Sequence, residues 1–236
     1  MNGLSYMDRN LAEIRRRIED AKGRRMGDFS KDDVTLLAAI KYTDAAHVNY
    51  LHKTLGISDV GENRVQQLLE RWDQLDREGL RIHFIGKLQS NKVKYIIDKV
   101  SMIESLDSIE LAKEIEKQAA KHGKVMDCLI EINIGDEASK GGIPKGEALA
   151  FAEAVSAFEH IRLCGIMTMA PKCTEIDEYR KYFRESYHIF IDICEKKLHN
   201  VNRCILSMGM SGSFTAALAE GANLIRVGRA AFQKEE

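Results

Sequence analysis

The chain has 236 residues, of which 44% are hydrophobic, and its 35 basic and 36 acidic residues nearly cancel in charge. A chain of this length can bury a large core and fits one barrel or one doubly wound sheet, so we expect a single domain over residues 1–236. The near-zero net charge gives no reason to expect nucleic acid or an anionic membrane as a partner. A small molecule or another protein is the better expectation.

Cysteine usage and the character of the N-terminus bear on the compartment. The five cysteines are odd in number and include no CxxC pair, a pattern typical of neither a disulfide framework nor a zinc site. The N-terminus lacks the apolar core of a signal peptide, and no stretch is apolar enough to span a bilayer. We therefore expect a cytoplasmic protein without a metal site.

Apolar runs and amphipathic stretches alternate along the whole chain. The first amphipathic stretch predicts a helix over residues 7–25. Helical patterns also lie between the apolar runs, with N-caps expected at Asp44, at Ser90 and at Asp107, where Glu110 completes a capping box. The apolar runs predict eight strands, at 34–40, 57–60, 81–86, 101–105, 127–134, 163–169, 203–209 and 223–228.

Strands that alternate with helices predict a parallel sheet. Eight repeats favour a closed (β/α)8 TIM barrel over an open sheet, which would leave two edges exposed. An open doubly wound sheet would usually carry a Gly-rich turn after its first strand, whereas residues 40–46 contain no glycine. Because only "RAAFQKEE" follows the last strand, we expect the extra N-terminal helix to cover the eighth helical position.

Lys41 follows the first predicted strand, "VTLLAAI". In a barrel the reactive groups come from the C-terminal ends of the strands. Apolar surroundings would disfavour the charged form of this lysine, which would lower its pKa and free the amine for attack on an aldehyde. From position alone, a lysine that extends to solvent or pairs with Glu62 is an equal alternative.

The ends of the last two predicted strands indicate a phosphate site. In "SMGMSGSFTAALAEG" (207–221), the hydroxyls of Ser211 and Ser213 and several backbone N–H groups gather at the start of a short helix. The last strand ends in "IRVGR", where Gly228 permits close backbone approach and Arg226 and Arg229 add positive charge. Singly, Ser211 is typical of an N-cap and Gly228 of a turn, but together these are the loops from which barrels build a phosphate cup.

An aldehyde-seeking lysine and a phosphate cup at one barrel mouth meet the needs of pyridoxal 5′-phosphate, whose phosphate anchors the ring. A Schiff-base aldolase of sugar phosphates has the same two needs, with Glu104 and Glu131 as its acidic groups. Composition and spacing do not separate these two functions.

Longer blocks of the sequence carry a family resemblance. In order along nearly the whole chain, they resemble the signature blocks of the pyridoxal phosphate homeostasis protein family. The resemblance implies a barrel like the N-terminal domain of alanine racemase. The blocks are "LLAAIKYTD" (36–44), "VGENRVQQLLER" (60–71), "HFIGKLQSNKVKYI" (83–96), "SLDS" (105–108), "IEINIGDEASKGGI" (130–143), "CGIMTMAP" (164–171) and "SMGMSGSFTAALAEGANLIRVGRAAF" (207–232).

The resemblance also implies roles for individual residues. Lys41 would form the Schiff base with pyridoxal phosphate, and Ser211 and Gly212, with the backbone at Gly228 and Arg229, would cradle the phosphate. Arg226 would approach the ring nitrogen or the phosphate; near the nitrogen, it would keep the ring unprotonated and weaken it as an electron sink.

Three further residues at predicted strand ends are cofactor-binding candidates by the same resemblance. They are Asn63, His83 and Met167, which would line the ring or its hydroxyl. Each has an ordinary structural alternative: a helix cap for Asn63, a satisfied core histidine for His83 and packing for Met167.

One position departs from the family pattern. The family's last block usually has threonine or serine after the glycine, where this chain has Arg229. The change removes one hydroxyl from the phosphate cup and offers a charge-assisted hydrogen bond in its place, so cofactor affinity could move in either direction.

The function implied is intracellular homeostasis of pyridoxal phosphate, by storage, buffering or delivery of the cofactor, without robust turnover. We expect a monomer whose partners are the cofactor and PLP-dependent apo-enzymes. The alternative is a weak PLP-dependent amino-acid racemase, for which Tyr42, Tyr95 or His83 would have to supply a second acid–base group.

Overall fold

The structure, a computed structural model, describes residues 3–22, 33–41, 43–137, 140–196, 198 and 201–234. Eight of its strands form the wall of a barrel, and each lies within a few residues of a predicted strand. The wall strands are β1 (Thr35–Ala39), β2 (Asp59–Glu62), β3 (Arg81–Phe84), β4 (Met102–Leu106), β5 (Met126–Asn133), β7 (Ile161–Thr168), β8 (Val201–Ser207) and β9 (Leu224–Val227).

Every pairing between these strands is parallel, and the pairings close on themselves. The sheet runs from β4 through β3, β2 and β1 to β9, β8, β7 and β5, and β5 pairs again with β4. A two-residue strand, β6 (Ile143–Pro144), pairs with β5 outside this ring. The predicted (β/α)8 barrel is therefore confirmed, and the C-terminal ends of all eight strands meet at one mouth.

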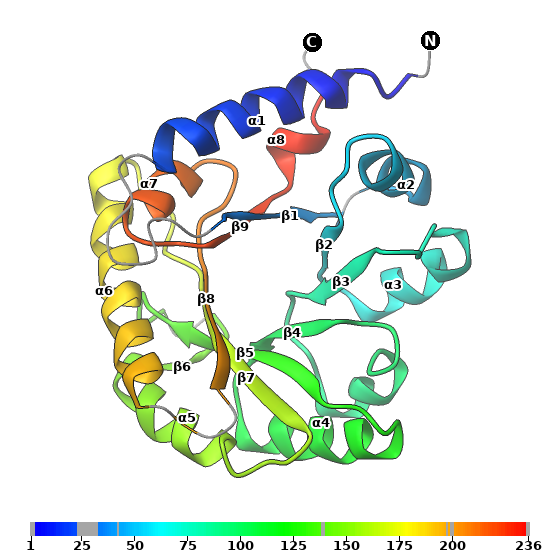
Figure 1. Cartoon of the computed structure of the whole chain (residues 1–236). Coiled ribbons are helices and arrows are strands. Elements are labelled where there is room, and N and C mark those ends of the chain that lie inside the picture. The colour runs from blue at the N-terminus through cyan, green and yellow to red at the C-terminus, as the bar shows by residue number, and fades with distance from the viewer. Residues whose placement is uncertain are drawn as a thin grey trace.

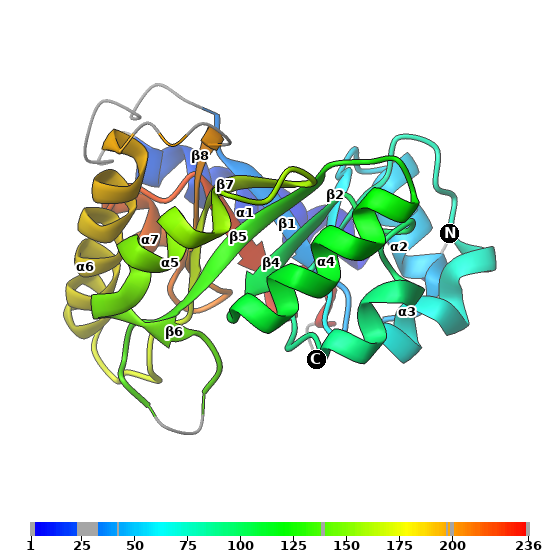
Figure 2. The same ribbon diagram turned by 90° about the horizontal axis from the view of Figure 1, so that it is seen from below.

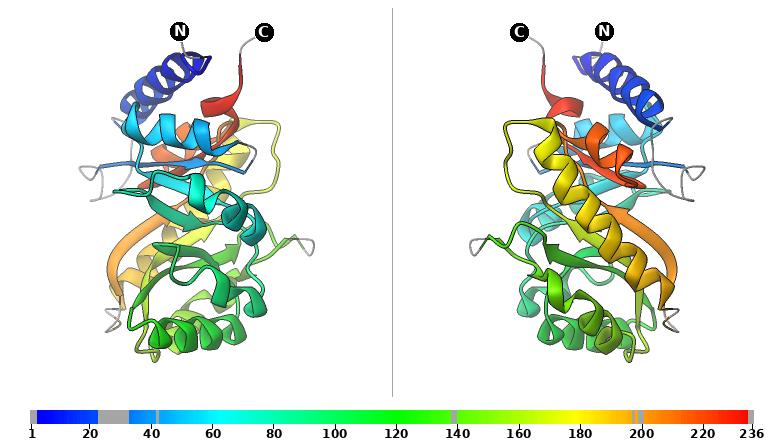
Figure 3. Two further views of the ribbon diagram at one scale, coloured as in Figure 1. Left: turned by 90° about the vertical axis from the view of Figure 1, so that its right-hand side faces the viewer. Right: turned by 90° about the vertical axis from the view of Figure 1, so that its left-hand side faces the viewer.

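Helices surround the barrel, as parallel strands require. They are α2 (Ala45–Lys53), α3 (Val65–Arg71), α4 (Ile109–Lys121), α5 (Ala148–Val155), α6 (Ile176–Glu195), α7 (Phe214–Ala219) and α8 (Arg229–Phe232), with short 3₁₀ helices η2 (Trp72–Gln74), η3 (Ser90–Tyr95) and η4 (Lys145–Glu147). Figure 2 shows α4 and α5 on the outer side of β5 and β7, which they contact. The long helix α6 lies along one side of the barrel, next to α7 (Figure 3).

Helix α1 (Tyr6–Lys22) lies across α7 and α8 and contacts both (Figure 1). Its apolar face buries Met7, Leu11, Ile14 and Ile18. The Asn10 amide donates hydrogen bonds to the carbonyl oxygens of Ala231 and Gln233, at 3.2 and 2.9 Å. The expectation that an extra N-terminal helix supplements the short eighth helix is confirmed; residues 23–25 of its predicted span lie outside the described residues.

The predicted helix starts are correct at one place and wrong at two. Asp44 caps α2, since its side chain accepts a hydrogen bond from the backbone N–H of His47. Ser90 is not an N-cap but the first residue of η3, a 3₁₀ helix in place of the expected α-helix. The cap of α4 is Ser108, one residue after the predicted Asp107, because the Ser108 side chain accepts from the N–H of Leu111.

The barrel interior holds two small apolar clusters with charged and polar side chains between them. Met102, Leu129, Cys164 and Met167 form one cluster, and Leu37, Ile85 and Leu224 form the other. The buried polar groups of the wall strands are Asp59, Glu62, His83, Glu104, Ser105, Glu131, Thr168, Ser207 and Arg226. Such groups are costly inside a protein unless they bond to one another, so their contacts define the candidate site.

Candidate cofactor site at the barrel mouth

Lys41 lies directly after Ile40, which continues β1 and is fully buried. Lys41 itself is exposed. Of the two alternatives that its position left open, the structure agrees with a lysine that extends to solvent and not with a buried one: the apolar run ends at Ile40, and Lys41 lies at the rim of the mouth. This position makes the amine accessible to a ligand that enters from solvent.

The loops after β8 and β9 meet through one side chain. The Ser211 hydroxyl oxygen accepts hydrogen bonds from the backbone N–H groups of Gly228 and Ala230, each at 3.3 Å. A Cβ at Gly228 would lie 3.2 Å from the Ala39 carbonyl oxygen, so a larger residue would crowd the end of β1. A Cβ at Gly212 would meet nothing within 4 Å, which leaves open space beside Ser211. Two backbone donors thus converge on one oxygen atom beside open space, an arrangement suited to an anion.

Arg226 lies on β9 and is only 5% exposed. Its Nη1 donates to the Ser207 hydroxyl at 2.6 Å, and its Nη2 donates to the Thr168 carbonyl at 2.8 Å. These bonds fix the guanidinium across the ends of β7 and β8. Arg229, by contrast, is the exposed first residue of α8.

Asn63 follows β2 and is held by its neighbours. The Glu62 carboxylate accepts from the backbone N–H groups of Asn63 and Arg64, at 2.7 and 3.1 Å. A Cβ at Gly86 would lie 2.1 Å from the Asn63 carbonyl oxygen, so the close approach of these two loops requires glycine there. The Asn63 Oδ1 atom is buried, and none of the described residues donates a hydrogen bond to it, which leaves an acceptor for a ligand.

His83 and Met167 are both buried, whereas Lys41 is exposed and Asn63 is partly exposed. Both ring nitrogens of His83 face carboxylates, Nδ1 at 2.7 Å from Glu104 Oε1 and Nε2 at 3.3 Å from Asp59 Oδ1. This arrangement leaves neither nitrogen for a ligand. Met167 is fully buried within an apolar cluster of the barrel interior, as its packing alternative expects.

The sequence interpretation gave Glu104, Ser207 and Thr168 no part in a cofactor site, although all three are fully buried near the mouth. Glu104 interrupts the apolar run of β4, and such a charge in a strand buried on both faces could have indicated an interior site. Ser207 and Thr168 carry no comparable signal, because small hydroxyl residues are common at strand ends.

Glu131 on β5 is a second interior carboxyl. Burial raises its pKa to about 7, and the nearby Asp107 carboxylate adds to the rise, while Arg226 and Lys87 oppose it. A Cβ at Gly141 would lie 3.6 Å from Glu131 Oε1 and 3.8 Å from Asp107 Oδ2, so the chain before β6 passes over both carboxyls. Glu131 therefore changes its charge near neutral pH.

Replacing Glu131 by glutamine is expected to stabilise the protein at pH 8 but not at pH 5. The folded-state pKa of Glu131 is raised above that of the unfolded chain, so the wild type loses stability as pH rises from about 4.5 to about 7. The amide avoids this loss, which is on the order of 3 kcal/mol. Urea unfolding at both pH values measures the difference. Glu153→Gln, at an exposed position on α5, is the control and should show no such pH dependence.

The chain is similar to a known protein family over almost its whole length. A family model described as "Alanine racemase, N-terminal domain" matches residues 4–235. The pyridoxal phosphate homeostasis protein of Aquifex aeolicus is 36% identical over 232 residues, 98% of each chain. That of Escherichia coli K12 is 32% identical over 236 residues, 98% of this chain and 97% of the relative.

Solved structures agree with these relatives. The structure of PipY from Synechococcus elongatus with PLP bound has a TM-score of 0.82 and 27% identity, and covers 96% of this chain and 99% of PipY. An alanine racemase of Clostridium difficile has a TM-score of 0.70 at 18% identity; it shares the fold over 98% of this chain and 57% of the racemase. The chain belongs to the alanine racemase N-terminal domain family and, within it, to the pyridoxal phosphate homeostasis proteins.

Proposed function

We propose that this chain binds pyridoxal 5′-phosphate at the barrel mouth and holds it for storage, buffering or delivery, without robust turnover. When bound, the cofactor supplies an aldehyde that condenses with a primary amine. The observation that carries the proposal is the convergence of the Gly228 and Ala230 N–H groups on one oxygen position, at the same mouth as Lys41.

The residues present fit such a ligand. Lys41 supplies the amine at the end of β1, and the donors around Ser211, Gly212, Gly228 and Arg229 suit a phosphate. Arg226 supplies a fixed positive charge beside this cup, and among the described residues no donor bonds to Asn63 Oδ1. Met167 would contribute apolar packing to the site. His83 is connected to Arg226 through Glu104 and Ser207.

Family membership also supports the wider setting of the function. We propose that residues 1–236 act as one monomeric domain in the cytoplasm, with PLP-dependent apo-enzymes as recipients of the cofactor. Within the described part of the chain, none of the helices is long and apolar enough to cross a bilayer.

Racemisation is the weaker alternative, because it needs acid–base groups on both faces of the substrate carbon. Both nitrogens of His83 are bonded to carboxylates. Tyr95 is 43% exposed on η3, beside the ammonium groups of Lys92 and Lys94. Tyr42, the third candidate, lies outside the described residues.

A titration of the apo-protein with pyridoxal phosphate, followed by visible absorption, tests the proposal. The wild type should develop a saturable band at one equivalent of cofactor, and Lys41→Ala should lose this band. Lys53→Ala removes a half-exposed lysine of α2 that pairs with Asp76, and should leave the titration unchanged. A wild type without a saturable band would contradict the proposal.

A further inference from the structure

A continuous row of hydrogen bonds runs through the barrel interior from Arg226 to Asp59. Arg226 bonds to Ser207 at 2.6 Å, Ser207 to Glu104 at 2.7 Å, and Glu104 to His83 at 2.7 Å. The other nitrogen of His83 lies 3.3 Å from Asp59. All five side chains are buried, and they come from β9, β8, β4, β3 and β2.

The direction of each hydrogen bond in this row is fixed by the chemistry of the groups. A guanidinium can only donate, so the Ser207 oxygen accepts from Arg226 and its single proton is given to Glu104 Oε2. Glu104 uses its other oxygen, Oε1, for His83. Since both neighbours of His83 are carboxylates, the imidazole donates from both nitrogens and carries a positive charge.

The charges along the row balance. Burial lowers the pKa of His83, but its hydrogen bonds to Asp59 and Glu104 outweigh burial and raise it to about 9. Burial raises the pKa of Glu104, yet His83 and Arg226 together hold it below its ordinary value. Asp59 is also paired with Arg81, whose Nε donates to Oδ1 at 2.7 Å and whose Nη2 donates to Oδ2. Two anions and two cations therefore alternate from Asp59 to Arg226.

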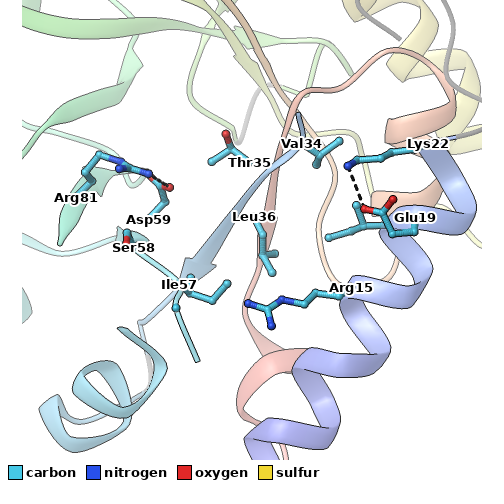
Figure 4. Close-up of a pocket in the computed structure, with 12 residues that line it drawn as sticks. Arg15, Glu19, Lys22, Val34, Thr35, Leu36, Ile57, Ser58, Asp59 and Arg81 are labelled. Atoms are coloured by element: carbon cyan, nitrogen blue, oxygen red, sulfur yellow. Dashed lines mark hydrogen bonds and ion pairs between the residues drawn. The ribbon is translucent and has the colours of Figure 1, made fainter. Parts of the chain in front are cut away.

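The row ends far from the mouth. Asp59 and Arg81 begin β2 and β3, and they line a pocket between α1 and the N-terminal ends of β1, β2 and β3 (Figure 4). Within the described barrel interior, two carboxylates act electrostatically on Arg226: Glu104 of β4 and Glu131 of β5. Glu104 is thus the only carboxylate in this part of the molecule that reaches Arg226 through a hydrogen-bonded side chain.

We propose that Glu104 and His83 are positioning residues: through Ser207 they hold the Arg226 guanidinium in place and set the net charge that the bound cofactor experiences. The effect on the bound cofactor rests on the proposed function. The positioning of Arg226 concerns the protein without any ligand. Glu104 anchors Arg226 through Ser207, and His83 bonds to the other oxygen of Glu104, so the negative charge of Glu104 is shared between two cations.

The first experiment uses the apo-protein and NMR of the arginine side chains. In the wild type, rotation of the Arg226 guanidinium about its Nε–Cζ bond should be slow, because both Nη groups are bonded. Glu104→Gln should speed this rotation. The matched control is Glu116→Gln, which breaks a second Glu–His pair, Glu116 Oε1 to His160 Nδ1 at 2.8 Å, outside the barrel. Unchanged Arg226 rotation in Glu104→Gln would overturn the positioning role.

The second experiment follows the pH midpoint of the visible band of bound pyridoxal phosphate. Glu104→Gln removes a negative charge and should lower the midpoint by about 1 unit, whereas His83→Gln removes a positive charge and should raise it by a similar amount. A purely structural role would not give shifts of opposite sign. Both variants should also weaken cofactor affinity by about tenfold, as loss of a supporting hydrogen bond does at metal sites.

The two experiments separate the two proposals. A wild type that takes up no pyridoxal phosphate contradicts the proposed function, while the NMR experiment on apo-protein still tests how Arg226 is held. A wild type that binds the cofactor, with variants whose midpoints stay equal or shift in one direction, retains the proposed function and overturns the electrostatic role of Glu104 and His83.

Discussion

Arg226→Gln is expected to weaken the binding of pyridoxal phosphate by about 30-fold or more, and to do so more than Lys41→Ala. Arg226 is held by Ser207 at 2.6 Å and Thr168 at 2.8 Å. Burial lowers the pKa of its guanidinium, and the nearby carboxylates Glu104 and Glu131 oppose this effect without cancelling it. Glutamine is neutral and too short to make both bonds. Charge-assisted hydrogen bonds contribute about 1.5–3 kcal/mol each, so losing one alone accounts for the expected effect.

Lys41→Ala is expected to weaken the binding of pyridoxal phosphate less than Arg226→Gln does, because the phosphate and ring contacts survive the loss of the covalent bond. Equilibrium titrations of the apo-proteins give the two dissociation constants. Arg162→Gln is the control for Arg226, since Arg162 also belongs to a wall strand but pairs with Asp127, 2.6 Å away at the opposite end of the barrel. A Lys41→Ala variant that loses as much affinity as Arg226→Gln would show that the covalent bond, not Arg226, dominates retention.

Gly165→Ala is expected to destabilise the barrel by about 3 kcal/mol or more, or to prevent folding. Gly165 lies on β7 at a φ of +136°, where the pairing register with β8 shifts. A Cβ there would lie 2.0 Å from the Ile205 carbonyl oxygen and 2.7 Å from the Ile205 nitrogen, so the backbone of β8 would have to move. That movement would reach Ser207, two residues further along the strand.

Urea unfolding measures this cost, and solubility reports a variant that cannot fold. The control is Gly146→Ala in η4, where a Cβ would meet nothing within 4 Å and φ is not in the left-handed region. The control should stay within about 0.5 kcal/mol of the wild type. A Gly165→Ala variant as stable as Gly146→Ala would mean that β7 and β8 can separate at this point without lowering the free energy of unfolding.

The architecture could be predicted from the sequence because it depends on periodicity alone. Apolar runs at regular spacing are sufficient to indicate eight parallel strands. Asp44 indicates the start of α2 because an N-cap bonds only to the first turn of its own helix. Ser90 and Asp107 show the limit of this approach. Both are good capping residue types, but whether a segment becomes a 3₁₀ helix, or whether the neighbouring Ser108 caps instead, depends on how the chain leaves the preceding strand.

The site was less predictable because its contacts cross the barrel. The sequence left open whether Lys41 is buried with the apolar run before it or extends to solvent; it is exposed at the rim, since the run ends at Ile40. For His83 the sequence left open a cofactor contact or a satisfied core histidine; its partners Asp59 and Glu104, which come from two other strands, agree with the second. One strand alone does not show which polar residues of other strands will meet it once the barrel closes. The composition of the loops after the last two strands indicated that they come together, and Ser211 does join them through its hydrogen bonds with Gly228 and Ala230; its contact with a phosphate stays a prediction.

The most direct test of the account is borohydride reduction of the protein loaded with pyridoxal phosphate, followed by peptide mass mapping. The account predicts one phosphopyridoxyl group, attached to Lys41 at the end of β1. An adduct on another lysine, or no adduct in a protein that has been shown to be folded, would contradict the assignment of the barrel mouth as the cofactor site.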